Sequence, residues 1–246
     1  MSIDVVDLRN FYAQHLGIVA RRFVGRGIRR RFADTRGMSV LGVGYPTPYL
    51  GLFREEAERC LAFMPAAQGV VKWPSDRPGL AALVDELELP LTDSAVDRVL
   101  LVHALEMAQD PAALLREVWR VLAAGGRLLI VVPNRRGVWA RLDTTPFGHG
   151  RPYSRSQITH LLRETWFTPT RMGRGAPCPA GRTRLVSALG SGLGAGRIGG
   201  RHALRRGAHR GGDEASLPRR AGAARTGPLG ACPRARARAV NATLAR

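Results

Sequence analysis

The stretch from Leu89 to Asn134 reads LPLTDSAVDRVLLVHALEMAQDPAALLREVWRVLAAGGRLLIVVPN, and it decides the fold. Val96 to Leu105 is an apolar run broken by only three polar residues, and Leu128 to Val132 is five consecutive branched aliphatic residues. Runs of this kind are typical of strands that are buried on both faces of a parallel sheet. The sequence therefore predicts two such strands here.

Between these strands the sequence predicts a helix. Asp110 is suited to cap it, and Pro111 suits its first position because the missing N–H is not needed there. Apolar residues then recur at helical spacing, at Leu114, Leu115, Val118, Val121 and Leu122, and Gly125-Gly126 is expected to end the helix. A parallel β-α-β unit with a right-handed crossover follows, which indicates an α/β doubly wound architecture.

The same residues resemble the second half of a class I S-adenosylmethionine-dependent methyltransferase. The matching phrases, in order, are Leu89-Pro90-Leu91, Val96-Asp97-Arg98-Val99, His103-Ala104-Leu105-Glu106, Asp110-Pro111, Leu115-Arg116-Glu117, Arg120-Val121-Leu122 and Gly125-Gly126-Arg127-Leu128. The resemblance is close over this fifth of the chain and loose over residues 10–170. It implies a mostly parallel Rossmann-like sheet, S-adenosyl-L-methionine as cofactor, and in-line methyl transfer to an acceptor that the motifs do not identify.

The resemblance places a Gly-rich cofactor loop at the end of the first strand, Met38 to Gly44. From it we expect Gly42, Gly44 and Tyr45 to contact the cofactor. Gly42 stands where the family has an acidic residue, and prolines at 46 and 48 replace later glycines, which fixes φ and removes two N–H donors. The alternative is that Gly44 only ends a strand.

The family also uses acidic residues to hold the ribose and the adenine. The second strand, expected at Arg59 to Met64, ends in Phe63-Met64-Pro65-Ala66 without a carboxylate. Either the ribose is held differently or the pocket has lost it. For the adenine, Asp85 is the expected acceptor, with Glu86 and Glu88 as rivals, and Leu89 is expected beside it; a solvated acidic face is the alternative.

Three further residues are candidates for the site. His103 follows the fourth strand, where open α/β sheets bind ligands, and it is expected either to line the cofactor pocket or to act as a base. A buried core histidine is the alternative reading. His149 and Tyr153 lie in the loop after the fifth strand, where the family builds its acceptor pocket, and their position alone makes them the candidate catalytic residues.

The chain divides by composition into three parts: an N-terminal helical segment (1–37), the methyltransferase domain (38–170) and an Arg/Gly/Ala-rich tail (171–246). The first part predicts one or two amphipathic helices from Val5 to Phe32, broken near Gly25 and Gly27. They are expected to cover the cofactor cleft, although basic helices of this kind also bind membranes or phosphates.

The tail holds 16 of the 38 basic residues but only two of the 19 acidic ones, so it carries most of the net charge of +19. After Phe167 the chain has no aromatic residue, which predicts a disordered tail. Two interpretations of the tail are possible. In the first, it binds nucleic acid or an anionic surface; in the second, it is a stretch with no selected fold, for instance one read in a shifted frame. We favour the second interpretation.

The tail shows no pattern for a seventh strand. The last strand of the sheet is therefore expected to be missing, which would leave the edge beside the fifth strand unpaired.

The remaining signals are negative. The spacing of Cys60, Cys178 and Cys232 suggests neither a disulfide framework nor a metal site. No apolar run reaches the roughly 18 residues of a membrane helix, and no secretory pattern opens the chain, so a cytoplasmic protein is expected. A small molecule is the expected methyl acceptor. A catalytically degenerate binding module is the alternative, and the sequence gives no indication of oligomeric state.

Overall fold

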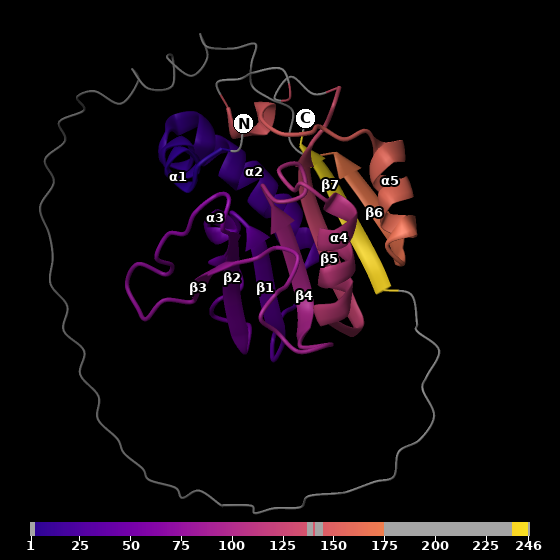
Figure 1. The fold of residues 1–246 in the computed structure, drawn as a ribbon. Coiled ribbons are helices and arrows are strands. Elements are labelled where there is room, and N and C mark those ends of the chain that lie inside the picture. The colour runs from indigo at the N-terminus through magenta and orange to yellow at the C-terminus, as the bar shows by residue number, and fades with distance from the viewer. Residues whose placement is uncertain (1–2, 137–139, 141–144, 175–237, 246) are drawn as a thin grey trace, which may run out of the picture. The chain divides into compact units, whose positions relative to one another are not determined.

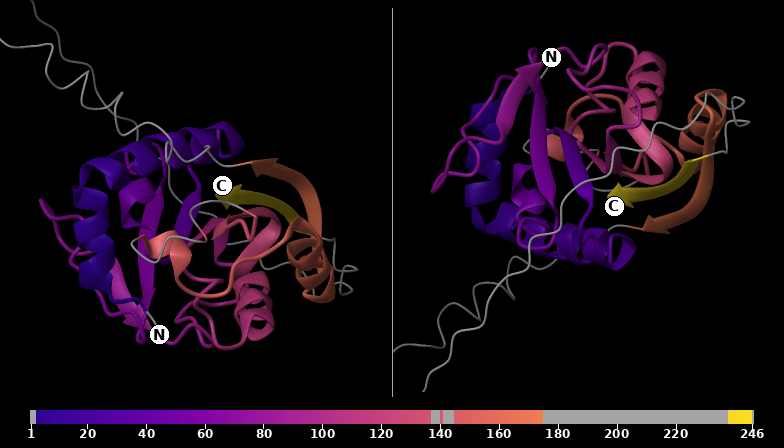
Figure 2. Two further views of the ribbon diagram at one scale, coloured as in Figure 1. Left: turned by 90° about the horizontal axis from the view of Figure 1, so that it is seen from above. Right: turned by 90° about the horizontal axis from the view of Figure 1, so that it is seen from below.

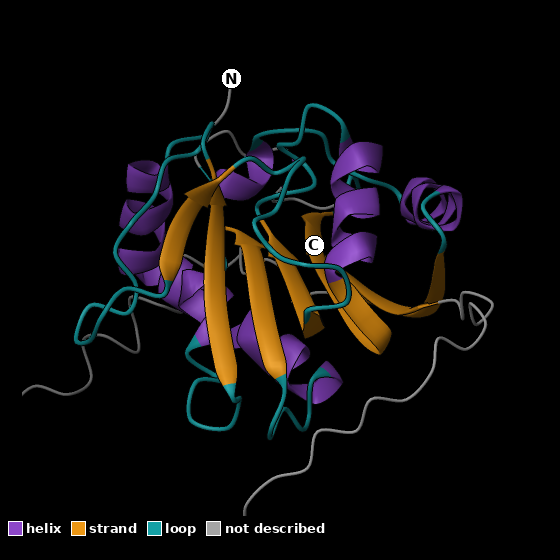
Figure 3. Cartoon of the chain, turned by 60° about the horizontal axis from the view of Figure 1, so that its bottom comes forward, coloured by secondary structure: helices purple, strands orange, loops and turns teal. Residues whose placement is uncertain are grey.

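The structure is a computed structural model that describes residues 3–136, 140, 145–174 and 238–245. The strands described form one sheet in the order β3-β2-β1-β4-β5-β7-β6, and every neighbouring pair is parallel (Figures 1 and 3). Their bounds are β1 Ser39–Gly44, β2 Arg59–Pro65, β3 Ala81–Val84, β4 Val96–Val102, β5 Leu122–Pro133, β6 Phe167–Arg174 and β7 Arg238–Ala245. The predicted doubly wound α/β fold is confirmed.

Helices cover both faces of this sheet (Figure 2). One face packs against α1 (Val5–Ala13), α2 (His15–Arg31) and the short α3 (Thr47–Leu50), and the other packs against α4 (Pro111–Val121) and α5 (Arg155–Glu164). A 3-10 turn, η2 (Pro146–Gly148), lies on the side of α1.

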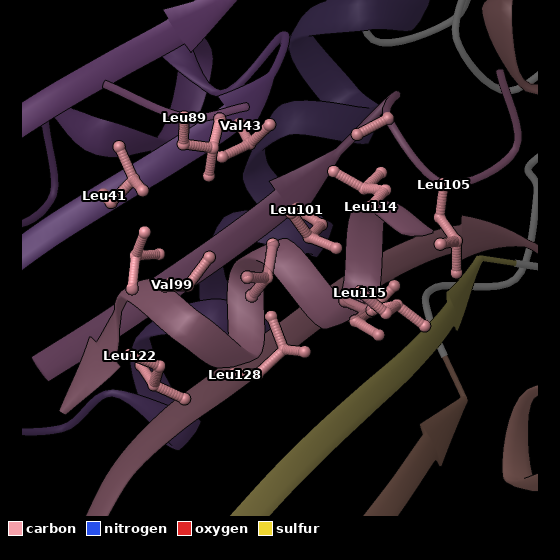
Figure 4. Close-up of a cluster of buried hydrophobic side chains, with 14 of the residues drawn as sticks. Leu41, Val43, Leu89, Val99, Leu101, Leu105, Leu114, Leu115, Leu122 and Leu128 are labelled. Atoms are coloured by element: carbon pink, nitrogen blue, oxygen red, sulfur yellow. The ribbon is translucent and has the colours of Figure 1, made fainter. Parts of the chain in front are cut away.

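Alternation along the strands explains these two layers. In β4, Val99 and Leu101 belong to the core under α4, whereas Leu100 and Val102 belong to the core under α1 and α2. Figure 4 shows the first of these cores, in which leucines of α4 meet side chains of β1, β4 and β5. Since both faces are covered, the central strands need apolar residues at every position, as the sequence predicted.

The predicted cap of α4 is present. A side-chain oxygen of Asp110 accepts hydrogen bonds from the N–H groups of Ala112 (3.0 Å) and Ala113 (2.9 Å). The expected end of the helix was wrong, because α4 ends at Val121 and Leu122 is already extended. Gly125 does have a positive φ of 78°, but within β5, next to a register shift against β4.

The expected break near Gly25 and Gly27 was also wrong. The helical segment breaks at Gln14, whose backbone is extended, and α2 continues through both glycines. Gly17 explains how α2 can turn back so tightly, because a Cβ there would lie 1.9 Å from the carbonyl oxygen of Phe11.

A final strand is present where we expected none. β7 lies between β5 and β6, with Leu128 opposite Val240 and Phe167 opposite Arg238, so the edge of β5 is paired. Both pairings are parallel. The segment RAVNATLA has the alternation of a short strand, with Val240, Ala242 and Leu244 at every second position, but the surrounding Arg-Ala sequence obscures it.

The predictions for the rest of the tail, including Cys178 and Cys232, fall on residues 175–237, outside those described. Cys60, the cysteine that the structure does describe, is buried in β2 and has a free thiol. Among the helices described, none combines the length and the apolar character needed to cross a bilayer.

Candidate cofactor-binding site

A cavity of about 810 Å³ lies at the carboxyl ends of β2 and β3, beside the loop that follows β4. Open α/β sheets bind their ligands at this edge. The cavity is lined by Pro65, Ala66, Ala67, Gln68, Val84, Asp85, Glu86, Leu87, Glu106, Met107, Ala108, Gln109, Gly150 and Arg151. Of the residues predicted to bind the cofactor, Asp85 therefore lines the cavity, as does its rival Glu86.

The charged residues of this cavity are mostly acidic. Asp85, Glu86 and Glu106 line it, against a single basic residue, Arg151. Asp85 follows β3 directly, and its carboxylate accepts a hydrogen bond from the backbone N–H of Leu87 at 2.8 Å. Burial raises the pKa of Glu86 above its ordinary value. The cavity thus suits a ligand that donates hydrogen bonds or carries positive charge.

Two buried side chains in this lining have unused acceptor atoms. Both carboxyl oxygens of Glu106 and the side-chain oxygen of Gln68 lack a hydrogen-bond partner, although Glu106 is 2% and Gln68 4% exposed. The Gln68 amide nitrogen donates to the carbonyl oxygen of His103. Buried acceptors are nearly always paired in native proteins. Nδ1 of His103, which also has no hydrogen bond, lies 3.3 Å from one carboxyl oxygen of Glu106, so the other Glu106 oxygen and the Gln68 oxygen are the acceptors with no donor described beside them.

The glycine loop lies beside this cavity but does not line it. Gly44 has a φ of 93°, and a Cβ there would lie 2.2 Å from the carbonyl oxygen of Val102. At Gly42 a Cβ would lie 2.4 Å from Pro46, so the glycine that replaces the family's acid is required by the proline that follows. Tyr45 is buried, and its N–H donates to the Val102 carbonyl at 2.7 Å.

His103 is a fully buried residue within an aromatic cluster. Its Nε2 lies 2.9 Å from the hydroxyl of Tyr12, which in turn lies 3.1 Å from the hydroxyl of Tyr49. Its Nδ1 lies 3.3 Å from a carboxyl oxygen of Glu106. The ring of Tyr45 stacks on Tyr12, with centroids 5.8 Å apart. Burial raises the pKa of Tyr12 well above its ordinary value, so this hydroxyl stays protonated.

Leu89 lies away from the cavity, in the core and next to an ion-pair cluster. Its N–H donates to Glu117 at 2.7 Å, and its carbonyl accepts from Arg120 at 3.0 Å. Arg120 also donates to Asp93 and to the carbonyl of Leu91, both at 2.8 Å. The Leu-Pro motif is thereby tied to α4.

The two candidate catalytic residues flank the cavity without lining it. His149 follows η2 and is half-buried; Gly150 and Arg151, which come next, do line the cavity. The hydroxyl of Tyr153 donates to the carbonyl of Leu105 at 3.2 Å, and burial raises its pKa. Their catalytic roles stay predictions.

Sequence reasoning missed several residues that the structure brings to this edge. Gln68 was not visible as a site residue because no motif contains it, and Tyr12 comes from α1, 91 positions before His103. Glu106 is the last residue of the resemblance phrase that begins at His103, but it was not a predicted site residue, and only its burial without a hydrogen bond marks it. Among the described residues, no three or more His, Cys, Asp or Glu side chains gather in a way that suits a metal ion.

Comparison with known proteins agrees with this arrangement. Residues 25–130 match the sequence family described as a methyltransferase domain. Over residues 25–130 the chain is therefore similar to a methyltransferase domain. A crystal structure from Thermotoga maritima, described as an S-adenosylmethionine-dependent methyltransferase and possible histamine N-methyltransferase, has the same fold, with a TM-score of 0.50 at 17% identity over 67% of this chain and 78% of that one.

Curated relatives point to the same family. A probable S-adenosylmethionine-dependent methyltransferase of Mycobacterium tuberculosis is 37% identical over 174 residues, which is 70% of this chain and 61% of that protein. A relative from Mycolicibacterium smegmatis, named in the same way, is 38% identical over 82 residues, 32% of each chain. The chain thus spans about three-fifths of the length of the first of these relatives.

Proposed function

We propose that this protein is an S-adenosylmethionine-dependent methyltransferase that acts on a small-molecule acceptor. The observation that carries the proposal is the acidic cavity at the carboxyl edge of a doubly wound parallel sheet, whose lining includes buried acceptor atoms without a hydrogen bond. The names of the relatives support the same activity.

The residues present fit the adenosine end of this cofactor. The carboxylates of Asp85 and Glu86, which follow β3, suit the exocyclic amine of the adenine, and the apolar Val84 and Ala108 suit its ring. Gly44 has the tight turn that the family places beside the methionine end of the cofactor, because a side chain at this position would collide with the carbonyl oxygen of Val102. We assign these residues to binding and orientation of the cofactor.

When bound, the cofactor supplies an activated methyl group on a sulfonium. The protein then has to hold the acceptor in line with that group and exclude water, and positioning of this kind supplies several kcal/mol. Arg151 and Gly150 place the loop after β5 against the cavity, where the Arg151 N–H donates to the carbonyl of Glu106 at 2.8 Å. His149 and Tyr153 are our candidates for orienting the acceptor or accepting its proton.

Two measurements test this function. Calorimetric titration with S-adenosylhomocysteine should give saturable binding with one site per chain. Transfer of a labelled methyl group from S-adenosylmethionine to a panel of amine, hydroxyl and carboxylate acceptors should then give a product with at least one class. Absence of binding at millimolar S-adenosylhomocysteine would refute the proposal.

A second candidate is a cofactor-binding module without catalysis. The loop after Gly44 supports this second candidate. Pro46 packs over Gly42, and Tyr45 is buried against Tyr12. None of these four residues belongs to the cavity lining. Adenosine distinguishes the two. A methyltransferase should bind S-adenosylhomocysteine more tightly than adenosine, whereas a module that recognises only the nucleoside should bind both equally.

A further inference from the structure

The end of β2 lacks the group that this fold ordinarily offers to a ribose. β2 ends at Pro65, and the next two residues that line the cavity, Ala66 and Ala67, have no side-chain acceptor. Gln68 is the first residue after β2 with a polar side chain. Any ribose bound at this edge must therefore find its acceptors elsewhere.

Gln68 is held by a bond between two loops. Its amide nitrogen donates to the carbonyl of His103, which follows β4, and β1 lies between β2 and β4 in the sheet. Because the nitrogen is engaged in this way, the orientation of the amide is set and the oxygen is the atom left without a partner. The bond brings the loop after β2 close to the loop that carries Glu106.

Glu106 completes a pair of acceptors on this wall. Its side chain is 1% exposed, and neither oxygen has a hydrogen bond, although one lies 3.3 Å from Nδ1 of His103. Gln68 and Glu106 line the same cavity, and the side-chain oxygens of both are acceptors without a hydrogen bond. Leaving a buried carboxylate oxygen without a donor is costly, so a ligand that brings two neighbouring hydroxyl donors would satisfy both side chains at once.

We propose that Glu106 and Gln68 together form the ribose-diol subsite of this protein, in place of the acidic residue that is absent from the end of β2. The 2′- and 3′-hydroxyls donate to the Glu106 carboxylate and to the Gln68 side-chain oxygen. This inference rests on the proposed function, because it assumes that the cofactor's nucleoside occupies the cavity. His103 and the Gln68 bond to its carbonyl act as positioning groups.

The test compares S-adenosylhomocysteine with its 2′-deoxy and 3′-deoxy analogues by calorimetry. In the unmodified protein, the deoxy analogue that lacks the hydroxyl donating to Glu106 should bind about ten- to a hundredfold more weakly than S-adenosylhomocysteine. In the Glu106→Met variant, the methionine side chain has a similar shape but no acceptor oxygen. The preference for S-adenosylhomocysteine over this deoxy analogue should therefore fall to less than about threefold. Glu88→Gln is the matched control, because it neutralises an exposed carboxylate next to the cavity but outside its lining and should keep the preference for the intact ribose.

Melting of the ligand-free protein separates this role from a structural one. If Glu106 serves the ligand, Glu106→Met should melt at the same temperature as the unmodified protein or higher, because an unsatisfied buried carboxylate is replaced by an apolar group. A Glu106→Met variant that melts well below the unmodified protein would show that Glu106 is needed for the fold and would overturn the assignment.

The outcomes also separate the subsite from the proposed function. If S-adenosylhomocysteine binds but the hydroxyl preference is the same in Glu106→Met, the ribose subsite is wrong and the proposed function stands. If the unmodified protein does not bind S-adenosylhomocysteine, both are wrong.

Discussion

Gly44 is the position where the structure predicts the most severe effect of a single methyl group. A Cβ on this residue would lie 2.2 Å from the Val102 carbonyl oxygen and 2.8 Å from Cβ of Ala104, at a φ of 93°. The positive φ costs a residue with a side chain about 1–2 kcal/mol. Forcing extra volume into a closed site costs about 1–3 kcal/mol more. Gly44→Ala should therefore lower the free energy of unfolding by about 2–5 kcal/mol, a large share of the stability of a typical domain.

Two other glycines separate these contributions. Gly37 also has a positive φ, of 64°, but a Cβ there meets nothing within 4 Å, so Gly37→Ala should show the backbone strain alone, about 1 kcal/mol. Gly51 has a φ of −56° and open space around it, so Gly51→Ala should be neutral or stabilise the protein by up to about 1 kcal/mol.

Urea unfolding followed by circular dichroism measures all three variants on one scale. The expected order of stability is Gly51→Ala, then Gly37→Ala, then Gly44→Ala. If Gly44→Ala is no less stable than Gly37→Ala, the backbone after β4 does not close over Gly44, and the description of the loop is wrong.

Three further predictions concern elements outside the cavity. Asp110→Ala should destabilise the protein by about 1 kcal/mol in urea unfolding, since two N–H groups of α4 lose their acceptor, whereas Arg116→Ala, on the exposed face of the same helix, should have little effect. Arg120 holds the pKa of Glu117 below its ordinary value of 4.5, so this pair should stabilise the fold above about pH 5 and lose its contribution as the pH falls below 4.5. Glu117→Gln should therefore reduce the loss of unfolding free energy on the acid side of a plot against pH. An unchanged plot would show that the pair is not a source of this pH dependence. Burial raises the pKa of the Cys60 thiol to about 12, so a variant with the other two cysteines replaced by serine should react with Ellman's reagent at pH 8 only after unfolding, and rapid reaction of the native protein would contradict the burial of β2.

The sequence predicted the central fold because the signals there are local. The apolar runs of β4 and β5 and the cap of α4 at Asp110 depend on residues that are neighbours in the chain. Gly125 was misread as the stop of α4 because a positive φ serves a bulge in a strand as well as the end of a helix.

The site was harder to predict because its parts come from distant segments. Asp85 was predicted from its motif and lines the cavity. For His103 the sequence left a pocket residue and a buried core residue open, and the structure has it fully buried, outside the cavity lining and bonded to Tyr12. Gln68 belongs to no motif, and its importance depends on a hydrogen bond to a backbone carbonyl 35 residues later. Unpaired acceptors become visible only once the burial of each side chain is known.

A titration with S-adenosylhomocysteine followed by amide NMR shows whether the cavity at the ends of β2 and β3 binds the cofactor. If it does, the resonances of Gln68, Asp85, Glu86 and Glu106, together with Gly44 at the end of β1, should shift saturably. Absence of shifts at millimolar ligand, or shifts confined to the exposed arginines of α2, would contradict it.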